Sequence, residues 1–352
     1  MASIYTFSLT ASQQAAVASM LSDLFVNSPS VESVHNIFTK IVNGSYIAET
    51  GDLTIMGKGG SGCSPASDTW TGATAKHLWA SLEWFTRREE CWTDLESSIM
   101  QWGKKYGMER GDMTADDYMA YVTEHLGNAL ADYMWRLAWF SDTAADNYSG
   151  GGKITNGVSP TYFTILDGFW KLMFTQVGVD PLQRVTVAGN SEASYALQDS
   201  VFTPTVAYNT LVSMYDKATV DTKILESGEA IIPCTRSFAD RWAKYLVGTG
   251  ITQTYENLIN GNIPMTFMGI PLIPIAAWDK TIRNYQGNGT VWYLPHRAVL
   301  TTKSNLLVGT KAESLYAEID IFYDKPSKKN YIDVTGDIDV ALMYANRFIA
   351  AY

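Results

Sequence analysis

The sequence predicts a mixed α+β fold, and three observations lead to this prediction. Apolar residues recur at steps of three and four over 114–140, which is the pattern of one long helix. Near the carboxyl end, 315–321 and 332–340 alternate apolar and polar residues around a turn, as in a hairpin with one buried face. Short helix-like and strand-like segments lie between these regions. A chain of 352 residues is expected to fold as two or three packed subregions.

Composition and charge exclude several classes of protein. Hydrophobic residues make up 46% of the chain and charged residues 18%, which is typical of a folded protein. A net charge of −10 argues against a general nucleic-acid binder. The longest apolar run, IPMTFMGIPLIPIAAW, is too short to span a bilayer, and the first thirty residues do not resemble a secretory signal. Cys63, Cys91 and Cys234 are too widely spaced for a disulfide framework or a zinc site, which favours a reducing, cytoplasmic environment.

The first elements are a helix and a long extended loop. The capping box Thr10-x-x-Gln13 opens a helix that is expected to run to about Phe25. Composition then turns to Gly, Ser, Thr and Asp, which predicts two extended arms around the tip TIMGKGGSGCSP. This tip resembles a phosphate-binding loop, but the glycine spacing is wrong and Gly59 occupies the position of the hydroxyl residue. The tip is therefore interpreted as a flexible loop.

The helix over 114–140 has the strongest signal in the chain. Thr114-x-x-Asp117 caps it, and its length at 1.5 Å per residue is about 39 Å. The polar, glycine-rich segment that follows ends it.

Shorter elements follow beyond Pro160. They are a helix near 165–174, the strand-like RVTVAG, a helix opened by Thr203-Pro204 with Leu211 and Met214 inward, and a helix from the Ser237-x-x-Asp240 box to Gly248 that groups Phe238, Trp242 and Tyr245.

The closing hairpin gathers carboxylates on one face. These are Glu318, Asp320, Asp333, Asp337 and Asp339. They could bind calcium, but calcium loops normally cluster their ligands within about a dozen residues. A solvated or ion-paired face is the favoured interpretation.

One segment resembles part of a catalytic motif. In VTVAGNSEAS, Gly189-x-Ser191-x-Ala193 follows an apolar strand, as in the nucleophile turn of serine hydrolases. Such an enzyme needs a later histidine, and only His296 follows. The alternative is that Ser191 caps a short helix that ends near Asp199. The capping role is favoured, and no enzyme activity is predicted.

The sequence predicts no metal or cofactor site. The four histidines lie outside helical reach of one another and of any cysteine, namely His35, His77, His125 and His296.

The order of these parts resembles the Hong Kong 97-type major capsid protein of tailed bacteriophages. The segment LPHRAVLTTKSNLLVGT, followed by EIDIFYDKPSKKNYIDVTGDIDVALMYANRFIAAY, is similar to the closing region of many such subunits, and MWRLAWFSDT at the end of the long helix is similar too. The resemblance implies five regions. They are an N-arm (1–43), an E-loop (44–75), a first part of the P-domain (76–177) with the spine helix 114–140, an A-domain (178–285) and the closing strands of the P-domain (286–352).

The resemblance also implies a function and partners. The expected function is an icosahedral virion shell, built from hexamers and pentamers of this chain in the bacterial host cytoplasm, that encloses double-stranded DNA. A portal protein is an expected partner. A separate scaffolding protein is expected as well, because the extra N-terminal region of some relatives is missing. No membrane partner is expected.

The glycine-rich tip is then expected to lie over a neighbouring subunit. Its candidate residues are Gly57, Lys58, Gly59, Gly60 and Gly62. Some family members cross-link an E-loop lysine to an asparagine of a neighbour, and Lys58 has a suitable position, although one loop lysine does not by itself predict this bond. Three alternatives stay open: an encapsulin-type nanocompartment shell, a serine hydrolase that uses Ser191, and an aromatic-rich binding module.

Overall fold

The computed structural model describes residues 34–50, 74–91, 101, 115–221, 223–249, 265–311, 318–324, 326–327 and 329–352. The helices of these residues are α4 (Ala115–Phe140), α5 (Phe169–Val179), α6 (Tyr195–Val201), α7 (Pro204–Asp221), α8 (Arg236–Gly248) and α10 (Ala276–Tyr285). The strands are β1 (Asn36–Phe38), β2 (Tyr46–Thr50), β3 (Thr74–Leu78), β4 (Leu82–Cys91), β5 (Arg184–Val185), β6 (Ala230–Cys234), β7 (Thr266–Phe267), β8 (Ile270–Pro274), β9 (Ala298–Thr302), β10 (Leu306–Gly309), β11 (Glu318–Asp324), β12 (Lys329–Leu342) and β13 (Phe348–Ala351). The helix expected to end near Phe25 and the glycine-rich tip lie outside the described residues.

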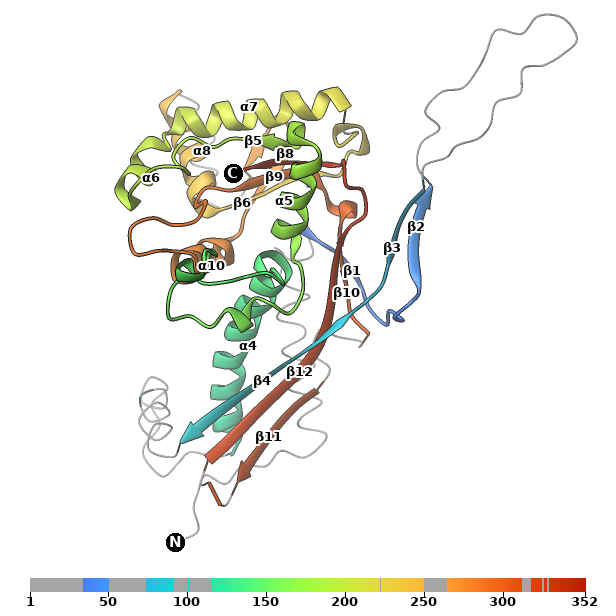
Figure 1. The fold of residues 1–352 in the computed structure, drawn as a ribbon, viewed down its shortest axis with the longest axis vertical. Helices are drawn as coiled ribbons and strands as arrows, with labels where there is room; N and C mark the ends of the chain where they lie inside the picture. The colour runs from blue at the N-terminus through green and yellow to red at the C-terminus, as the bar shows by residue number, and fades with distance from the viewer. Residues whose placement is uncertain are drawn as a thin grey trace, which may run out of the picture.

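The long helix is confirmed. Helix α4 has 26 residues and runs beside the strands β4, β12 and β11 (Figure 1). Its described apolar side chains Leu130, Met134 and Leu137 are buried in one cluster with residues of β11 and β12. The ring of Trp84 on β4 meets the ring of Tyr133 edge-on, with centroids 5.1 Å apart. The helix is therefore stabilised mainly by the sheet that it covers.

The closing hairpin is also confirmed. Strands β11 and β12 pair antiparallel, with Ile319 opposite Val334 and Asp320 opposite Asp333. On the face toward α4, Ile332, Val334 and Ile338 are buried. Strand β12 also pairs with β4 and with β10, and β10 pairs in turn with β1. Strand β12 is therefore the central strand of the five-stranded sheet.

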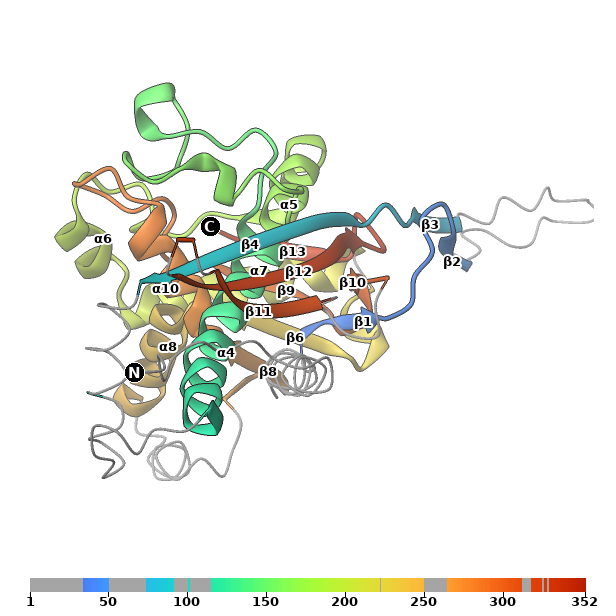
Figure 2. The same ribbon diagram turned by 90° about the horizontal axis from the view of Figure 1, so that it is seen from below.

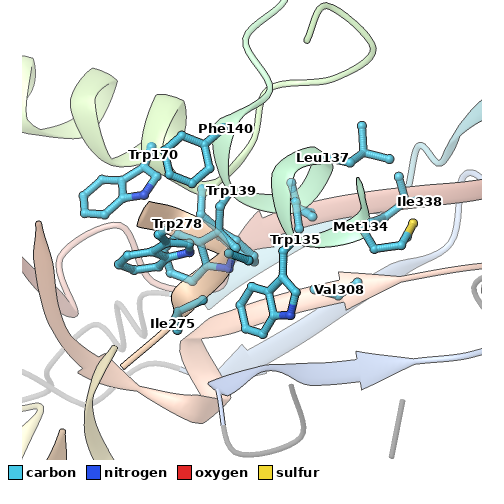
Figure 3. Packing of buried hydrophobic residues seen from close by; sticks show 14 of the residues in the cluster. Met134, Trp135, Leu137, Trp139, Phe140, Trp170, Ile275, Trp278, Val308 and Ile338 are labelled. Atoms are coloured by element: carbon cyan, nitrogen blue, oxygen red, sulfur yellow. The ribbon is translucent and has the colours of Figure 1, made fainter. Parts of the chain in front are cut away.

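Aromatic rings from three helices fill the centre of this core. Trp139 at the end of α4 is fully buried, and Figure 3 shows it beside Trp170 of α5 and Trp278 of α10. The ring centroid of Trp139 lies 5.9 Å from that of Trp170 and 4.4 Å from that of Trp278. The indole N–H of Trp139 donates to Nε2 of His35 at 2.8 Å. A tryptophan at the helix end thus joins α4 to both later helices.

A second sheet lies above this core in Figure 1. Its order is β5-β13-β9-β6-β8-β7, and the last strand of the chain, β13, lies between β5 and β9. Helix α7 contacts β13, and α8 contacts both α7 and β8. The predicted inward residues Leu211 and Met214 of α7 are buried, which confirms that helix and its orientation.

Helix α5 begins later than the predicted 165–174. It starts at Phe169, after Gly168, whose N–H donates to the carbonyl of Ser141 at 2.8 Å. A Cβ at Gly168 would lie 2.8 Å from the carbonyl oxygen of Ala138, so only glycine lets the chain cross the end of α4 this closely. The preceding residues are held by this crossing and cannot join the helix.

The strand expected in RVTVAG is shorter than predicted. Strand β5 covers only Arg184 and Val185, which pair in parallel with the end of β13. Val187 makes one further hydrogen bond, from its N–H to the carbonyl of Tyr352 at 3.3 Å.

The predicted capping role of Ser191 is wrong. The chain turns at Ser191, and α6 begins after Ser194, whose hydroxyl accepts the N–H of Leu197 at 3.3 Å. Both serines have the right chemistry, and the turn after Gly189 decides between them. Gly189 has a φ of +102° and lies so close to Gln198 that a Cβ would be 2.9 Å from its carbonyl oxygen.

The Ser237 box does not cap α8 either. The N-cap residue is Thr235, and its side chain makes no capping hydrogen bond. Instead, the carboxylate of Asp279 on α10 accepts the N–H groups of Arg236 at 2.6 Å and Ser237 at 3.5 Å. A residue from another helix therefore supplies the cap.

Candidate assembly surfaces

A two-stranded ribbon extends away from both sheets. Strands β2 and β3 pair antiparallel from Tyr46 opposite Leu78 to Thr50 opposite Thr74 (Figures 1 and 2). This pairing confirms, for the described residues, the two extended arms expected around the tip. Tyr46 is 69% exposed and Leu78 is 58% exposed. An isolated pair of strands is marginally stable in water, so these apolar side chains are available for burial against a partner.

The base of this ribbon is held firmly. Nε2 of His77 and the N–H of Ala80 both lie 2.9 Å from Oδ2 of Asp339 on β12. Trp79 is buried and packs over Gly309, where a Cβ would lie 2.5 Å from the indole ring. The hydroxyl and N–H of Ser81 donate to one side-chain oxygen of Asn43. The ribbon is thus anchored to the five-stranded sheet while its strands stay exposed.

The outer face of the five-stranded sheet carries an aromatic and arginine cluster. The guanidinium of Arg87 binds the carboxylate of Asp333 through two hydrogen bonds, at 2.7 and 2.5 Å. It also lies 5.6 Å from the ring centre of Phe85 and 5.4 Å from that of Tyr331. The hydrogen bond to Asp333 raises the pKa of Arg87. Phe85 is 57% exposed, so this face combines an apolar ring with a fixed ion pair.

Three of the five hairpin carboxylates have separate protein partners. Asp333 pairs with Arg87, and Asp339 accepts from His77 and Ala80. Asp337 is buried and accepts from the hydroxyl of Thr310 and the N–H of Lys311. These contacts favour the ion-paired interpretation of the face. Among the described residues, no group of three or more His, Cys, Asp or Glu side chains is arranged to hold a metal ion.

The structure does not bring Ser191 to His296. Both ring nitrogens of His296 are engaged elsewhere: Nδ1 lies 2.9 Å from the hydroxyl of Ser237, and Nε2 lies 3.1 Å from the carbonyl oxygen of Gln198. The main chain of His296 is held by Asn190, which donates to its carbonyl and accepts from its N–H. The contact between Ser237 and His296 joins residues 59 positions apart. Their separation along the chain is why the sequence did not reveal this pair.

The Ser237–His296 pair has the geometry of a structural contact. The cavity beside it has a volume of about 20 Å³, which is enough for one water molecule and too small for a substrate. The ring of His296 stacks on Phe202 with centroids 4.1 Å apart. Burial lowers the pKa of His296 to about 4, so the ring is neutral at physiological pH.

The structure describes one of the remaining candidate residues and leaves the loop residues outside its described part. Cys234 is buried with a free thiol, and burial raises its pKa. The loop residues Gly57, Lys58, Gly59, Gly60 and Gly62 lie outside the described part of the chain. In the described part, no helix is both long enough and apolar enough to cross a lipid bilayer.

Solved structures of phage capsids are similar to this chain. A chain of the satellite phage P4 procapsid, a structure that includes the size determination (Sid) protein, matches 99% of this chain and 92% of its own, with a TM-score of 0.50 and 10% identity. A chain from Mycobacterium phage Ogopogo matches 90% and 89%, with a TM-score of 0.48 and 14% identity. A chain from the capsid of cyanophage P-SCSP1u matches 90% and 86%, with a TM-score of 0.48 and 11% identity. No protein-family model and no curated protein sequence matches the chain. The protein therefore has the fold found in phage capsids.

Proposed function

We propose that this chain is the major capsid protein of a tailed bacteriophage and forms an icosahedral shell around double-stranded DNA. The single observation that carries the proposal is the shared fold with the P4 procapsid chain, which extends over 99% of this chain. A partial match would allow a capsid-like module in another kind of protein. A match over nearly the whole length instead favours the same role for the whole subunit.

The regions of the Hong Kong 97-type fold are assigned as follows. The ribbon of β2 and β3 belongs to the E-loop (44–75), which follows an N-arm (1–43). The P-domain combines 76–177, with α4 as the spine helix, and the closing strands of 286–352. The A-domain is 178–285, and β9 and β13 from the closing segment complete its sheet. Two observations support this division: α4 packs on β11 and β12, and α7 and α8 contact the other sheet.

Assembly would use the exposed ribbon and the tip beyond it. The ribbon presents Tyr46 and Leu78 to solvent while its base is anchored through Asp339. A neighbouring subunit would cover these side chains, and the tip with Gly57, Lys58, Gly59, Gly60 and Gly62 would lie across the boundary. The subunits would form hexamers and pentamers in the bacterial host cytoplasm. A scaffolding protein and a portal protein would act with them, and DNA would be held by enclosure.

The test is electron microscopy of the full-length chain, expressed alone and together with the scaffolding gene of its source genome. Closed shells with fivefold and sixfold clusters are expected, and shells purified from infected cells should contain double-stranded DNA. Shells that contain enzymes instead of DNA would identify an encapsulin-type compartment. A monomer or small closed oligomer under all conditions would contradict the proposal, and a bound glycan on that monomer would favour a binding module.

A matched enzymatic test addresses the hydrolase alternative. Neither ring nitrogen of His296 contacts Ser191, so a fluorophosphonate probe should not label this serine. Labelling that disappears in Ser191→Ala would instead favour an enzyme. This variant should otherwise behave as wild type, because the hydroxyl that caps α6 is that of Ser194.

A further inference from the structure

A cavity lies where the end of α4, helix α5 and the segment before β9 meet. Its volume is about 410 Å³, within the range of small-molecule sites. The lining combines aromatic rings with charged and polar side chains. It includes Phe140, Trp170, Phe174, Tyr293, Lys153 and Arg297.

Arg297 is the central feature of this cavity. Its side chain is only 1% exposed, yet it makes no ion pair with a carboxylate of the described residues. Nε donates to the carbonyl of Leu294 at 2.8 Å, and Nη2 donates to Oε1 of Gln286 at 2.9 Å and to the carbonyl of Tyr293 at 2.8 Å. The two N–H groups on Nη1 have no acceptor within the described part of the chain. A buried cation is normally paired, so this charge lacks its usual partner.

The surroundings compensate the charge only in part. The guanidinium lies 5.1 Å from the ring centres of Phe140 and Trp170, which gives a cation–π attraction. Burial lowers the pKa of Arg297 to about 10, so it still carries its charge at neutral pH. Two carboxylates also line the cavity, those of Asp142 and Asp146, and Asp142 pairs with Lys171 at 2.8 Å.

Two buried polar atoms of lining residues are unsatisfied. The hydroxyl of Ser141 and the indole N–H of Trp170 have no hydrogen-bond partner among the residues that the structure describes. Lys153 adds a second positive charge on an exposed part of the lining, with Nζ 5.1 Å from the ring centre of Tyr293. The lining carries three cationic side chains, Lys153, Lys171 and Arg297, against two carboxylates, and this excess of positive charge suits an anion.

We propose that this cavity binds a small ligand with a phosphate or carboxylate group, whose oxygen atoms accept hydrogen bonds from Nη1 of Arg297. The aromatic lining would contact an apolar part of the same ligand. The proposal goes beyond the role in a shell. Ligand binding is measured on the full-length chain whether or not shells form. A failure to assemble and a failure to bind the ligand can therefore be told apart.

The experiment is a calorimetric titration with phenyl phosphate and, separately, with benzoate, against sodium chloride at the same ionic strength. One of the two probes should bind saturably at one site per subunit. Arg297→Met keeps the apolar volume and removes the charge, and it should weaken binding by about 30-fold or more, as expected for loss of a charged hydrogen bond. Absence of binding by both probes, or a folded Arg297→Met variant with wild-type affinity, would overturn the site.

A second variant keeps the test informative where Arg297→Met does not fold. Lys153→Glu reverses an exposed charge of the lining and should weaken binding by about tenfold, while Lys244→Glu on the exposed side of α8 is the matched control. Equal affinities in these two variants would show that binding occurs elsewhere. A structure of the complex should place the anionic group beside Nη1.

Discussion

Single polar side chains determine where the helices around the second sheet begin. Ser194 supplies the capping hydroxyl of α6, and Asp279 on α10 supplies two acceptors at the start of α8. Burial raises the pKa of Asp279, whereas its hydrogen bonds from the main chain act in the opposite direction. At residue scale, therefore, the chain uses one local cap and one cap from a distant element.

The cap on α6 gives a simple prediction. Ser194→Ala should lower the free energy of unfolding by about 1 kcal/mol, the usual cost of losing a helix N-cap. Ser191→Ala is the matched control, because Ser191 is an exposed serine in the preceding turn, and its effect should stay within about 0.5 kcal/mol. Urea denaturation of both variants is the measurement. An equal loss in the two would mean that the hydroxyl of Ser194 does not act as the cap.

His296 gives a prediction about pH. Its pKa falls from 6.5 to about 4 on folding, because burial disfavours the charged ring. Between these values the unfolded state binds more protons than the folded state. The contribution of His296 to the free energy of unfolding is therefore complete above pH 6.5 and is lost as the pH falls toward 4. The loss amounts to about 3 kcal/mol.

A variant isolates this effect from other titrating groups. His296→Gln removes the ring, so its free energy of unfolding should fall less steeply than that of wild type between pH 6.5 and 4. Urea midpoints at closely spaced pH values provide the measurement. Parallel curves for the two proteins would contradict the burial argument.

At the scale of elements, the ribbon and the body contrast in how they are stabilised. Helix α4 is held by a continuous core that includes Trp139, Trp170 and Trp278. Among the residues that the structure describes, the β2–β3 ribbon is held by its own pairing and by the anchor at its base, where His77 and Trp79 contact the sheet region. A change beyond the ribbon is therefore expected to leave the body intact.

Deletion of 57–62 tests this separation. The segment has four glycines, one lysine and one serine, so it has no apolar side chain to bury in a lone subunit. The variant should keep the wild-type melting temperature, while shell closure is prevented or weakened because the contact across the subunit boundary is lost. Calorimetry and electron microscopy at equal protein concentration measure both properties. Normal shells from the deletion variant, or early protection of this segment from hydrogen exchange in the monomer, would refute the intersubunit role.

At the scale of the molecule, charge shapes how DNA is contained. The net charge is −10, from 26 basic and 36 acidic residues. Non-specific affinity for DNA comes from release of counterions by clustered basic side chains, and this balance does not favour it. The proposed shell would hold DNA by enclosure.

The free subunit should accordingly bind duplex DNA weakly. Fluorescence anisotropy at physiological salt is expected to give a dissociation constant above about 100 μM. This value is the weak limit of typical non-specific DNA binding. A titration at low salt serves as the comparison. Submicromolar, salt-sensitive binding by the monomer would contradict enclosure as the sole mode of containment.

Elements with a periodic, local signal could be predicted from the amino-acid sequence alone. Helix α4 and the β11–β12 hairpin were predictable because apolar side chains repeat every three to four or every two residues. The inward side of α7 was predictable for the same reason. The order of these elements was also enough to suggest a capsid fold, which the match to the P4 procapsid chain supports.

Features that depend on contacts between residues far apart in the sequence could not be predicted in this way. Gly168 delays the start of α5 because it crosses the end of α4, and Asp279 caps α8 from another helix. Ser237 became the partner of His296, and Arg297 became a buried cation, through packing between separate elements. No local pattern records such contacts, because their energies come from burial and hydrogen bonding that exist only after the sheets and helices have come together.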